Sequence, residues 1–91
     1  MAATILVVED EPAIQELVAC NLELAGHRTL RAESAEQAMG MVRDELPDLI
    51  VLDWMLPGIN GVEFARRLRG DKRTHDVPLI MLTARADEQD K

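Results

Sequence analysis

The chain has a single cysteine and no long apolar run, and these two features limit the kinds of protein that it can be. Cys20 is the only cysteine, so an internal disulfide is impossible and a reducing compartment is favoured. No apolar segment approaches the roughly 20 residues that span a bilayer, and no signal peptide is recognisable before Ile5. We therefore expect a cytoplasmic protein that does not bind membranes.

Positive charge is also scarce. Ten Lys and Arg residues face 17 Asp and Glu residues, which gives a net charge of -7 and a pI near 4.7. This balance disfavours phosphate backbones and anionic membranes as direct partners, and it favours divalent cations and basic protein surfaces. The glycine-rich loops that hold nucleotide phosphates are absent as well. Any phosphoryl group used here must come from another molecule.

Four short strands are predicted from the apolar pattern. Three runs rich in Val, Ile and Leu end at polar residues, as is typical of strands buried on both faces of a parallel sheet. A weaker segment has alternating character, which favours a strand at the sheet edge. The expected strands are 5–8, 27–32, 49–52 and 79–82.

Three helices are predicted between these strands, each with start and stop signals. The signals are Pro12 and Gly26, then Ser34 with Gln37 and Pro47, then Asn60 with Glu63 and Gly70. In the first helix the apolar residues fall on one face: Ile14, Leu17, Val18, Leu22 and Ala25. Strands joined by helices form right-handed crossovers, so the fold class is α/β with a doubly wound parallel sheet.

Acidic residues end two of the buried strands, and this pattern predicts a metal site. If strands 5–8 and 49–52 are neighbours, Asp10 and Asp53 meet at the carboxyl edge of the sheet, and Thr83 joins them from strand 79–82. Two carboxylates about 4 Å apart repel by roughly 4 kcal/mol at an effective dielectric near 20, so a cation is needed. Hard oxygen ligands select Mg²⁺ or Mn²⁺, with a coordination position left for phosphate.

These residues also match a known family. Glu9-Asp10, Asp53 with residues 55–58, and Thr83-Ala84 occur in this order at successive strand ends. The arrangement resembles the receiver domain of two-component response regulators and looks closest to the phosphate-regulon members of the OmpR/PhoB subfamily. The resemblance implies a flavodoxin-like sheet of order 2-1-3-4-5. Residues 1–91 would be the N-terminal portion of that domain, ending before the fifth strand.

The resemblance implies a role for each matching position around the metal. Asp10 and Asp53 would be Mg²⁺ ligands, Met55 would give its backbone carbonyl, and Glu9 would bind through water or orient Asp10. Asp53 would also be the phosphoacceptor.

The phosphoryl group itself would be held by two further positions. The hydroxyl of Thr83 would donate a hydrogen bond to a phosphoryl oxygen and act as the switch, assisted by the backbone N–H of Ala84. A fifth-strand lysine common to receivers has no counterpart here, since Lys91 follows Thr83 too closely. We therefore expect the fourth and fifth helices and the fifth strand to lie largely outside this chain, which leaves the 91-residue fragment poorly stable and prone to association.

The implied function is signalling rather than enzymatic turnover. A sensor histidine kinase would phosphorylate Asp53 with Mg²⁺, the receiver would dephosphorylate itself slowly, and phosphorylation would promote a homodimer. DNA binding would depend on a C-terminal output domain absent here, in a phosphate-starvation response. The alternative is a stand-alone or degenerate receiver that acts as an interaction module.

Two rival classes fit the residues less well. Aspartyl-phosphate hydrolases resemble an Asp-x-Asp pattern, whose second position is Met55 here. A flavodoxin-like electron carrier needs a polar phosphate loop after the first strand, where the acidic residues 9–11 would repel the flavin phosphate.

Overall fold

Four parallel strands form one sheet in the computed structural model, which describes residues 2–53 and 60–82. The strands are β1 (Thr4–Val8), β2 (Arg28–Ala32), β3 (Leu49–Asp53) and β4 (Leu79–Leu82). Their order across the sheet is β2-β1-β3-β4. The expected order of the first four strands is confirmed.

The strand register brings particular chain ends together. Val8 at the end of β1 pairs with Leu52, and Asp53 at the end of β3 pairs with Leu82 of β4. Because all the strands are parallel, their carboxyl ends share one edge of the sheet. Residues directly after β1 are therefore placed beside Asp53.

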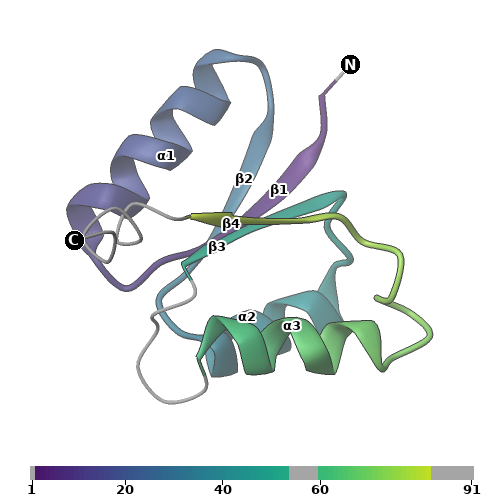
Figure 1. Cartoon of the computed structure of the whole chain (residues 1–91). Coiled ribbons are helices and arrows are strands. Elements are labelled where there is room, and N and C mark those ends of the chain that lie inside the picture. The colour runs from purple at the N-terminus through teal and green to yellow at the C-terminus, as the bar shows by residue number, and fades with distance from the viewer. Residues whose placement is uncertain (1, 54–59, 83–91) are drawn as a thin grey trace.

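Helices cover both faces of the sheet, which confirms the doubly wound class. The helix α1 (Pro12–Leu24) lies on one face, and α2 (Ala35–Asp44) and α3 (Gly61–Arg69) lie together on the other (Figure 1). No helix among the described residues is long and apolar enough to cross a membrane.

The helices begin and end near the signals in the sequence, but one hydrogen bond of the α2 capping box has a different donor from the one expected. Asn60 caps α3, because its side chain accepts a hydrogen bond from the N–H of Glu63 at 2.9 Å. Ser34 caps α2 through the N–H of Gln37 at 3.1 Å. The reciprocal bond of the capping box comes from the Glu33 N–H, not from Ser34, and reaches Gln37 Oε1 at 2.7 Å. Gly26 follows α1 with a φ of 96°, a conformation that favours glycine.

The core lies mainly between the sheet and the pair α2 and α3. Successive strand residues point to opposite faces, so alternate positions of β1 and β3 face these helices. Leu6 and Ile50 are fully buried there beside Phe64 of α3.

The other face of the sheet is less completely covered. Within the part of the chain that the structure describes, α1 alone covers this face, and Ala19 is its only fully buried residue. Ile14 is exposed and Leu17 retains 63% of its accessible surface, whereas Val18 and Leu22 are half-buried. Only part of the apolar face expected for the first helix is therefore buried.

Candidate metal centre

Three carboxylates meet where β1 and β3 end. Glu9 and Asp10 directly follow β1, and Asp53 is the last residue of β3. Each offers one carboxylate oxygen, and these three oxygens all lie within 4.8 Å of one another. The predicted meeting of Asp10 and Asp53 is thus confirmed, and Glu9 belongs to the same group.

The three carboxylates differ in their surroundings. Asp10 is exposed, whereas Glu9 keeps 1% and Asp53 keeps 5% of its accessible surface. The buried Glu9 carboxylate accepts a hydrogen bond from the N–H of Glu11 at 3.0 Å. This bond folds the Glu9 side chain back beside the start of α1. Glu9 is therefore fixed in place, while Asp10 faces solvent.

The side chain of Gln15 binds backbone carbonyl groups at the ends of β1 and β2, a role that the sequence analysis did not predict. Its Nε2 donates to the carbonyl oxygens of Glu9 at 2.9 Å and Ala32 at 3.2 Å. The Glu9 N–H also donates to the Ala32 carbonyl at 3.0 Å. One helical side chain thus ties the ends of β1 and β2 together. The only signal in the sequence is a polar residue in the first turn after Pro12.

The electrostatics of the cluster favour a bound cation. Two carboxylates 4.8 Å apart repel by about 3.5 kcal/mol at an effective dielectric near 20, and burial of Glu9 and Asp53 weakens screening by water. A cation shared between their oxygens offsets this repulsion.

The spacing of the donors fits a small hard cation. Octahedral Mg²⁺ binds oxygens at about 2.0–2.1 Å, which places two of its ligands about 2.9–4.2 Å apart. Oxygens as much as 4.8 Å apart therefore suit direct binding by some carboxylates and a bridging water for another. The all-oxygen donor set is the kind that Mg²⁺ and Mn²⁺ prefer.

Three other predicted site residues, Met55, Thr83 and Ala84, lie outside the described residues. Leu82, which precedes Thr83 in the sequence, pairs with Asp53 across the sheet.

The histidines and the cysteine lie away from the cluster. His27 Nδ1 accepts the N–H of Ala3 at 3.1 Å, and His75 Nδ1 lies 3.0 Å from Asp76 Oδ1. Cys20 is exposed, and its thiol donates to Glu16, whose carboxylate raises the pKa of the thiol.

Comparison with known proteins identifies the family. A model of the response regulator receiver domain matches residues 5–91. The phosphate regulon transcriptional regulatory protein PhoB of Pseudomonas aeruginosa is 53% identical over 88 residues, covering 97% of this chain and 38% of that protein. PhoB of Escherichia coli is 46% identical over 91 residues, covering 100% of this chain and 40% of that protein. The chain thus spans well under half the length of these curated relatives.

Solved structures agree with this match. The N-terminal domain of a response regulator receiver protein from Methanoculleus marisnigri superposes with a TM-score of 0.88 at 38% identity, covering 92% of this chain and 68% of that one. A chemotaxis response regulator of Vibrio cholerae gives a TM-score of 0.86 at 25% identity, covering 98% of this chain and 77% of that one. The sheet order, the position of the acidic cluster and these matches agree: the chain belongs to the response regulator receiver domain family and is of the OmpR/PhoB type.

Proposed function

We propose that residues 1–91 are the phosphoacceptor portion of a two-component transcriptional response regulator, in which Asp53 accepts a phosphoryl group from a sensor histidine kinase. The observation that carries this proposal is the convergence of the Asp53 carboxylate with those of Glu9 and Asp10 within 4.8 Å. Receiver domains are signalling proteins rather than enzymes in the usual sense, and the family binds Mg²⁺ at an acidic pocket.

Asp53 is the nucleophile in this proposal. Its carboxylate oxygen attacks the phosphorus of a phosphohistidine in line, the O–P bond forms as the P–N bond breaks, and the electron pair leaves with the imidazole. The product is an acyl phosphate on Asp53. Bound Mg²⁺, or Mn²⁺ in its place, supplies positive charge to the phosphoryl oxygens.

Asp10 and Glu9 have different proposed roles at the metal. Asp10 is a direct ligand, which suits its exposed carboxylate next to Asp53. Glu9 acts through water or by orienting Asp10, because its own carboxylate is buried and already bonded to the Glu11 N–H. The backbone carbonyl of Met55 completes the protein ligands, an assignment that rests on the family resemblance.

Thr83 and Ala84 are proposed to hold the phosphoryl group on Asp53. The Thr83 hydroxyl and the Ala84 N–H donate to phosphoryl oxygens, and inward movement of Thr83 is the switch. The pairing of Leu82 with Asp53 supports this proposal, because it places the residue before Thr83 level with the acceptor.

The proposed output is transcriptional control in the cytoplasm. Phosphorylation favours a homodimer, slow autodephosphorylation ends the signal, and DNA is bound by a C-terminal domain that is not part of this chain. The similarity to regulators named for the phosphate regulon supports a role in the response to phosphate starvation.

Replacing the acceptor tests the proposal directly. Asp53→Asn is expected to abolish the acid-labile, hydroxylamine-sensitive label acquired from acetyl phosphate with Mg²⁺, since an amide cannot form the acyl phosphate. Asp44→Asn is the matched control, because Asp44 is exposed on α2 and lies outside the cluster. Persistent labelling of Asp53→Asn would overturn the assignment of the acceptor. A wild-type protein that takes no label would favour the interaction-module alternative.

A further inference from the structure

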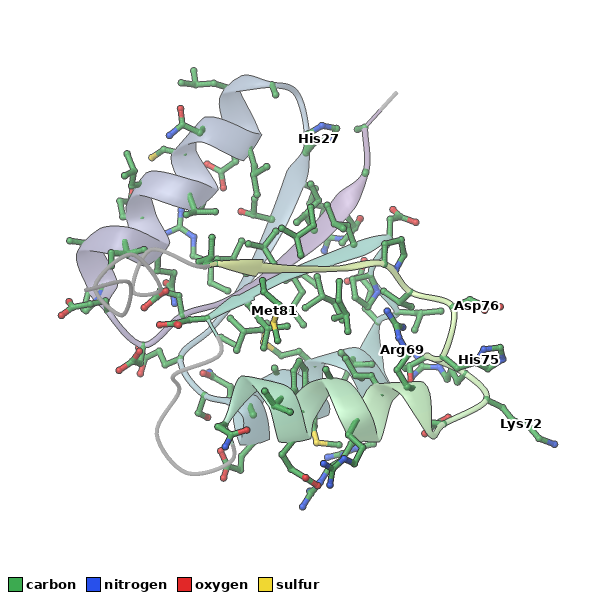
Figure 2. The ribbon with its side chains drawn as sticks, in the orientation of Figure 1. His27, Arg69, Lys72, His75, Asp76 and Met81 are labelled. Atoms are coloured by element: carbon green, nitrogen blue, oxygen red, sulfur yellow. The ribbon has the colours of Figure 1, made fainter. Side chains whose placement is uncertain are left out.

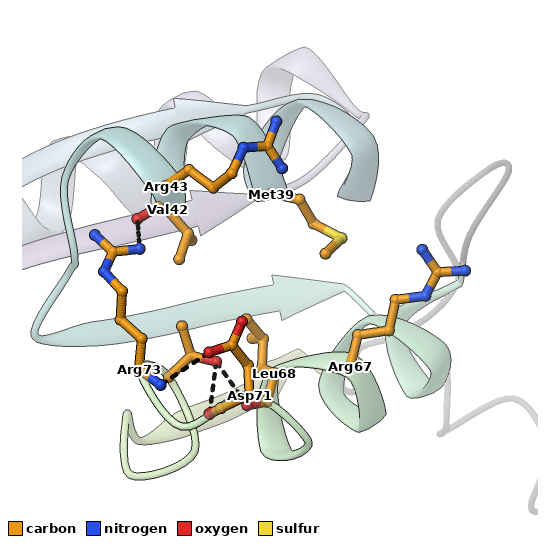
Figure 3. Close-up of a pocket in the computed structure, with 8 residues that line it drawn as sticks. Met39, Val42, Arg43, Arg67, Leu68, Asp71 and Arg73 are labelled. Atoms are coloured by element: carbon orange, nitrogen blue, oxygen red, sulfur yellow. Dashed lines mark hydrogen bonds between the residues drawn. The ribbon is translucent and has the colours of Figure 1, made fainter.

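A concave site lies away from the carboxylate cluster, between α2 and α3. It is a pocket of about 110 Å³ beside the turn that leads from α3 to β4 (Figure 3). Arg69, Lys72, His75 and Asp76 mark this end of the molecule, where β4 begins (Figure 2). The pocket is therefore at the amino ends of the strands, and the carboxylates are at the opposite edge of the sheet.

The floor of this pocket is apolar and firmly held. Val42 and Leu68 are buried members of the core, and Met39 of α2 is half-buried and packed against it. An apolar cavity of about 150 Å³ accommodates a benzene molecule. At about 110 Å³ the pocket has room for one aliphatic side chain such as leucine, and the flexible Met39 side chain adapts to its shape.

The rim of the pocket carries three guanidinium groups, those of Arg43, Arg67 and Arg73. Arg43 is exposed and forms no ion pair with any residue in 2–53 or 60–82. Arg67 Nε lies 3.2 Å from a Glu63 oxygen, but Glu63 also pairs with Arg66 at 3.2 Å. One carboxylate is thus shared between two guanidinium groups.

Arg73 holds the rim in shape. Its Nη1 donates to the carbonyl of Val42 at 2.6 Å, and its backbone N–H donates to Asp71 Oδ1 at 2.8 Å (Figure 3). Asp71 also lines the pocket, so the rim includes one carboxylate that is already engaged within its own turn. These contacts fasten the turn after α3 to the C-terminal end of α2.

The charge around the pocket is opposite to that of the whole chain. Between Gly61 and Pro78 five Lys and Arg side chains face three acidic ones, although the chain carries a net charge of -7. None of the described residues that line the pocket is aromatic, so this part of the chain offers it no ring on which a nucleic-acid base could stack. An apolar floor framed by arginines instead suits a protein segment with acidic residues on either side of an aliphatic one.

We propose that this pocket docks an acidic segment of a partner protein. A leucine-type side chain of that segment fills the space between Met39 and Leu68, and the flanking carboxylates pair with Arg43 and Arg67. The site is separate from the proposed phosphoacceptor, so it provides a second point of contact that does not block Asp53.

Fluorescence anisotropy with a labelled peptide tests the proposal on the intact protein. The probe is a heptapeptide with a central leucine and three acidic residues on each side, and its matched control has serine at the centre. We expect saturable binding that is at least about tenfold weaker for the serine peptide, because the leucine side chain leaves water when it fills the pocket and serine does not. We also expect Arg43→Glu to weaken binding about tenfold, since charge-assisted hydrogen bonds are lost.

Lys72→Glu is the matched charge control. Lys72 lies in the cationic segment, residues 61–78, and is exposed, but it does not line the pocket. Lys72→Glu and Arg43→Glu change the net charge equally. We expect Lys72→Glu to alter binding by less than about twofold at 0.15 M salt, because an exposed charge that makes no direct contact with the peptide contributes little and is screened. The ¹³C-methyl resonance of Met39 should shift with the leucine peptide. Circular dichroism establishes that each variant is folded.

Several outcomes would overturn the proposal. Equal losses in Arg43→Glu and Lys72→Glu, or equal affinity for the leucine and serine peptides, would show that charge alone attracts the probe. A Met39 methyl resonance unchanged at saturation would place the peptide elsewhere. Tighter binding of a single-stranded oligonucleotide of equal charge would identify a nucleic-acid surface instead, and wild-type protein that binds neither peptide would exclude the docking site.

Discussion

Two adjacent acidic residues, Glu9 and Asp10, occupy different environments at the end of β1. The Glu9 carboxylate is buried against the Glu11 N–H, whereas the Asp10 carboxylate is exposed beside that of Asp53. A buried, hydrogen-bonded carboxylate orients its neighbours, and an exposed one is free to replace water around a cation. The two positions should therefore respond differently to substitution.

Removing Asp10 should weaken Mg²⁺ binding by at least about 10- to 100-fold, since loss of an outer-shell partner already costs this much and Asp10 is the proposed direct ligand. Trp54 is next to Asp53 in the sequence and is the only tryptophan, so its emission provides the readout. Titration of Mg²⁺ should change this emission with saturation, and EDTA should reverse the change. Asp10→Ala is compared with Asp44→Ala, and superimposable titrations of the two variants would count against Asp10 as a ligand.

Gln15→Ala should lower the free energy of unfolding by about 1–2 kcal/mol, because two hydrogen bonds to strand-end carbonyls disappear. Urea denaturation measures the loss. Asn21→Ala is the control, since the Asn21 side chain makes a single exposed bond to the Leu17 carbonyl of its own helix. A Gln15→Ala variant as stable as Asn21→Ala would mean that the Gln15 bonds contribute nothing measurable.

At the scale of helices and strands, the prediction from sequence succeeded where one strong local rule applies. The apolar runs at 49–52 and 79–82 gave β3 and β4 to within one residue, because short runs of Val, Ile, Leu and Met that stop at polar residues are typical of parallel strands. The expected burial on both faces holds for Ile50, Val51 and Leu52 of β3 but not for β4, where Ile80 is exposed. Ser34 and Asn60 were predicted as helix caps because their side chains can accept a hydrogen bond from the backbone N–H of the residue three positions later, and the structure has both bonds.

What the sequence missed depends on contacts between elements. Gln15 reaches the ends of β1 and β2 only because the sheet order places both beside α1. The exposure of Ile14 and Leu17 depends on what else covers that face of the sheet, which the periodicity of a single helix does not encode. The pocket between α2 and α3 likewise combines Arg43 with Arg67 from separate helices.

Asn60→Ala should destabilise the fold by about 1 kcal/mol, because the Glu63 N–H loses its acceptor at the start of α3. For a domain of this size the melting temperature should fall by about 4–8 °C. Asn60→Asp keeps an acceptor and adds favourable negative charge at a helix N-terminus, so it should melt at or above the wild-type temperature. Equal melting of Asn60→Ala and wild type would show that the cap is dispensable.

At the scale of the whole molecule, the two faces of the sheet and its two ends differ in character. The carboxylates gather at one edge and the cationic segment at the other, while apolar side chains remain exposed on the side of α1. Ile80 of β4 keeps 51% of its surface, and β4 pairs only with β3 among the described strands. An unpaired apolar strand edge favours association with other chains.

Ile80→Lys should reduce self-association of the 91-residue chain, since lysine on an edge strand opposes pairing with a second copy. Sedimentation velocity over a range of concentrations measures the effect, with Ile80→Val as the control that keeps the surface apolar. Wild-type chain that stays monomeric at every concentration would contradict the expected association.

The central position of β1 also affects how the chain folds during synthesis. β1 leaves the ribosome before β2 and β3, and it pairs with β2 on one side and β3 on the other. About 20 residues separate the end of β2 from the end of β3. At a translation rate of roughly 5–20 residues per second, the edge of β1 that pairs with β3 therefore stays unpaired for about 1–4 s after β2 has been made. Throughout that interval the edge of β1 that will pair with β3 presents unpaired backbone N–H and C=O groups, and such an edge is open to pairing with another chain.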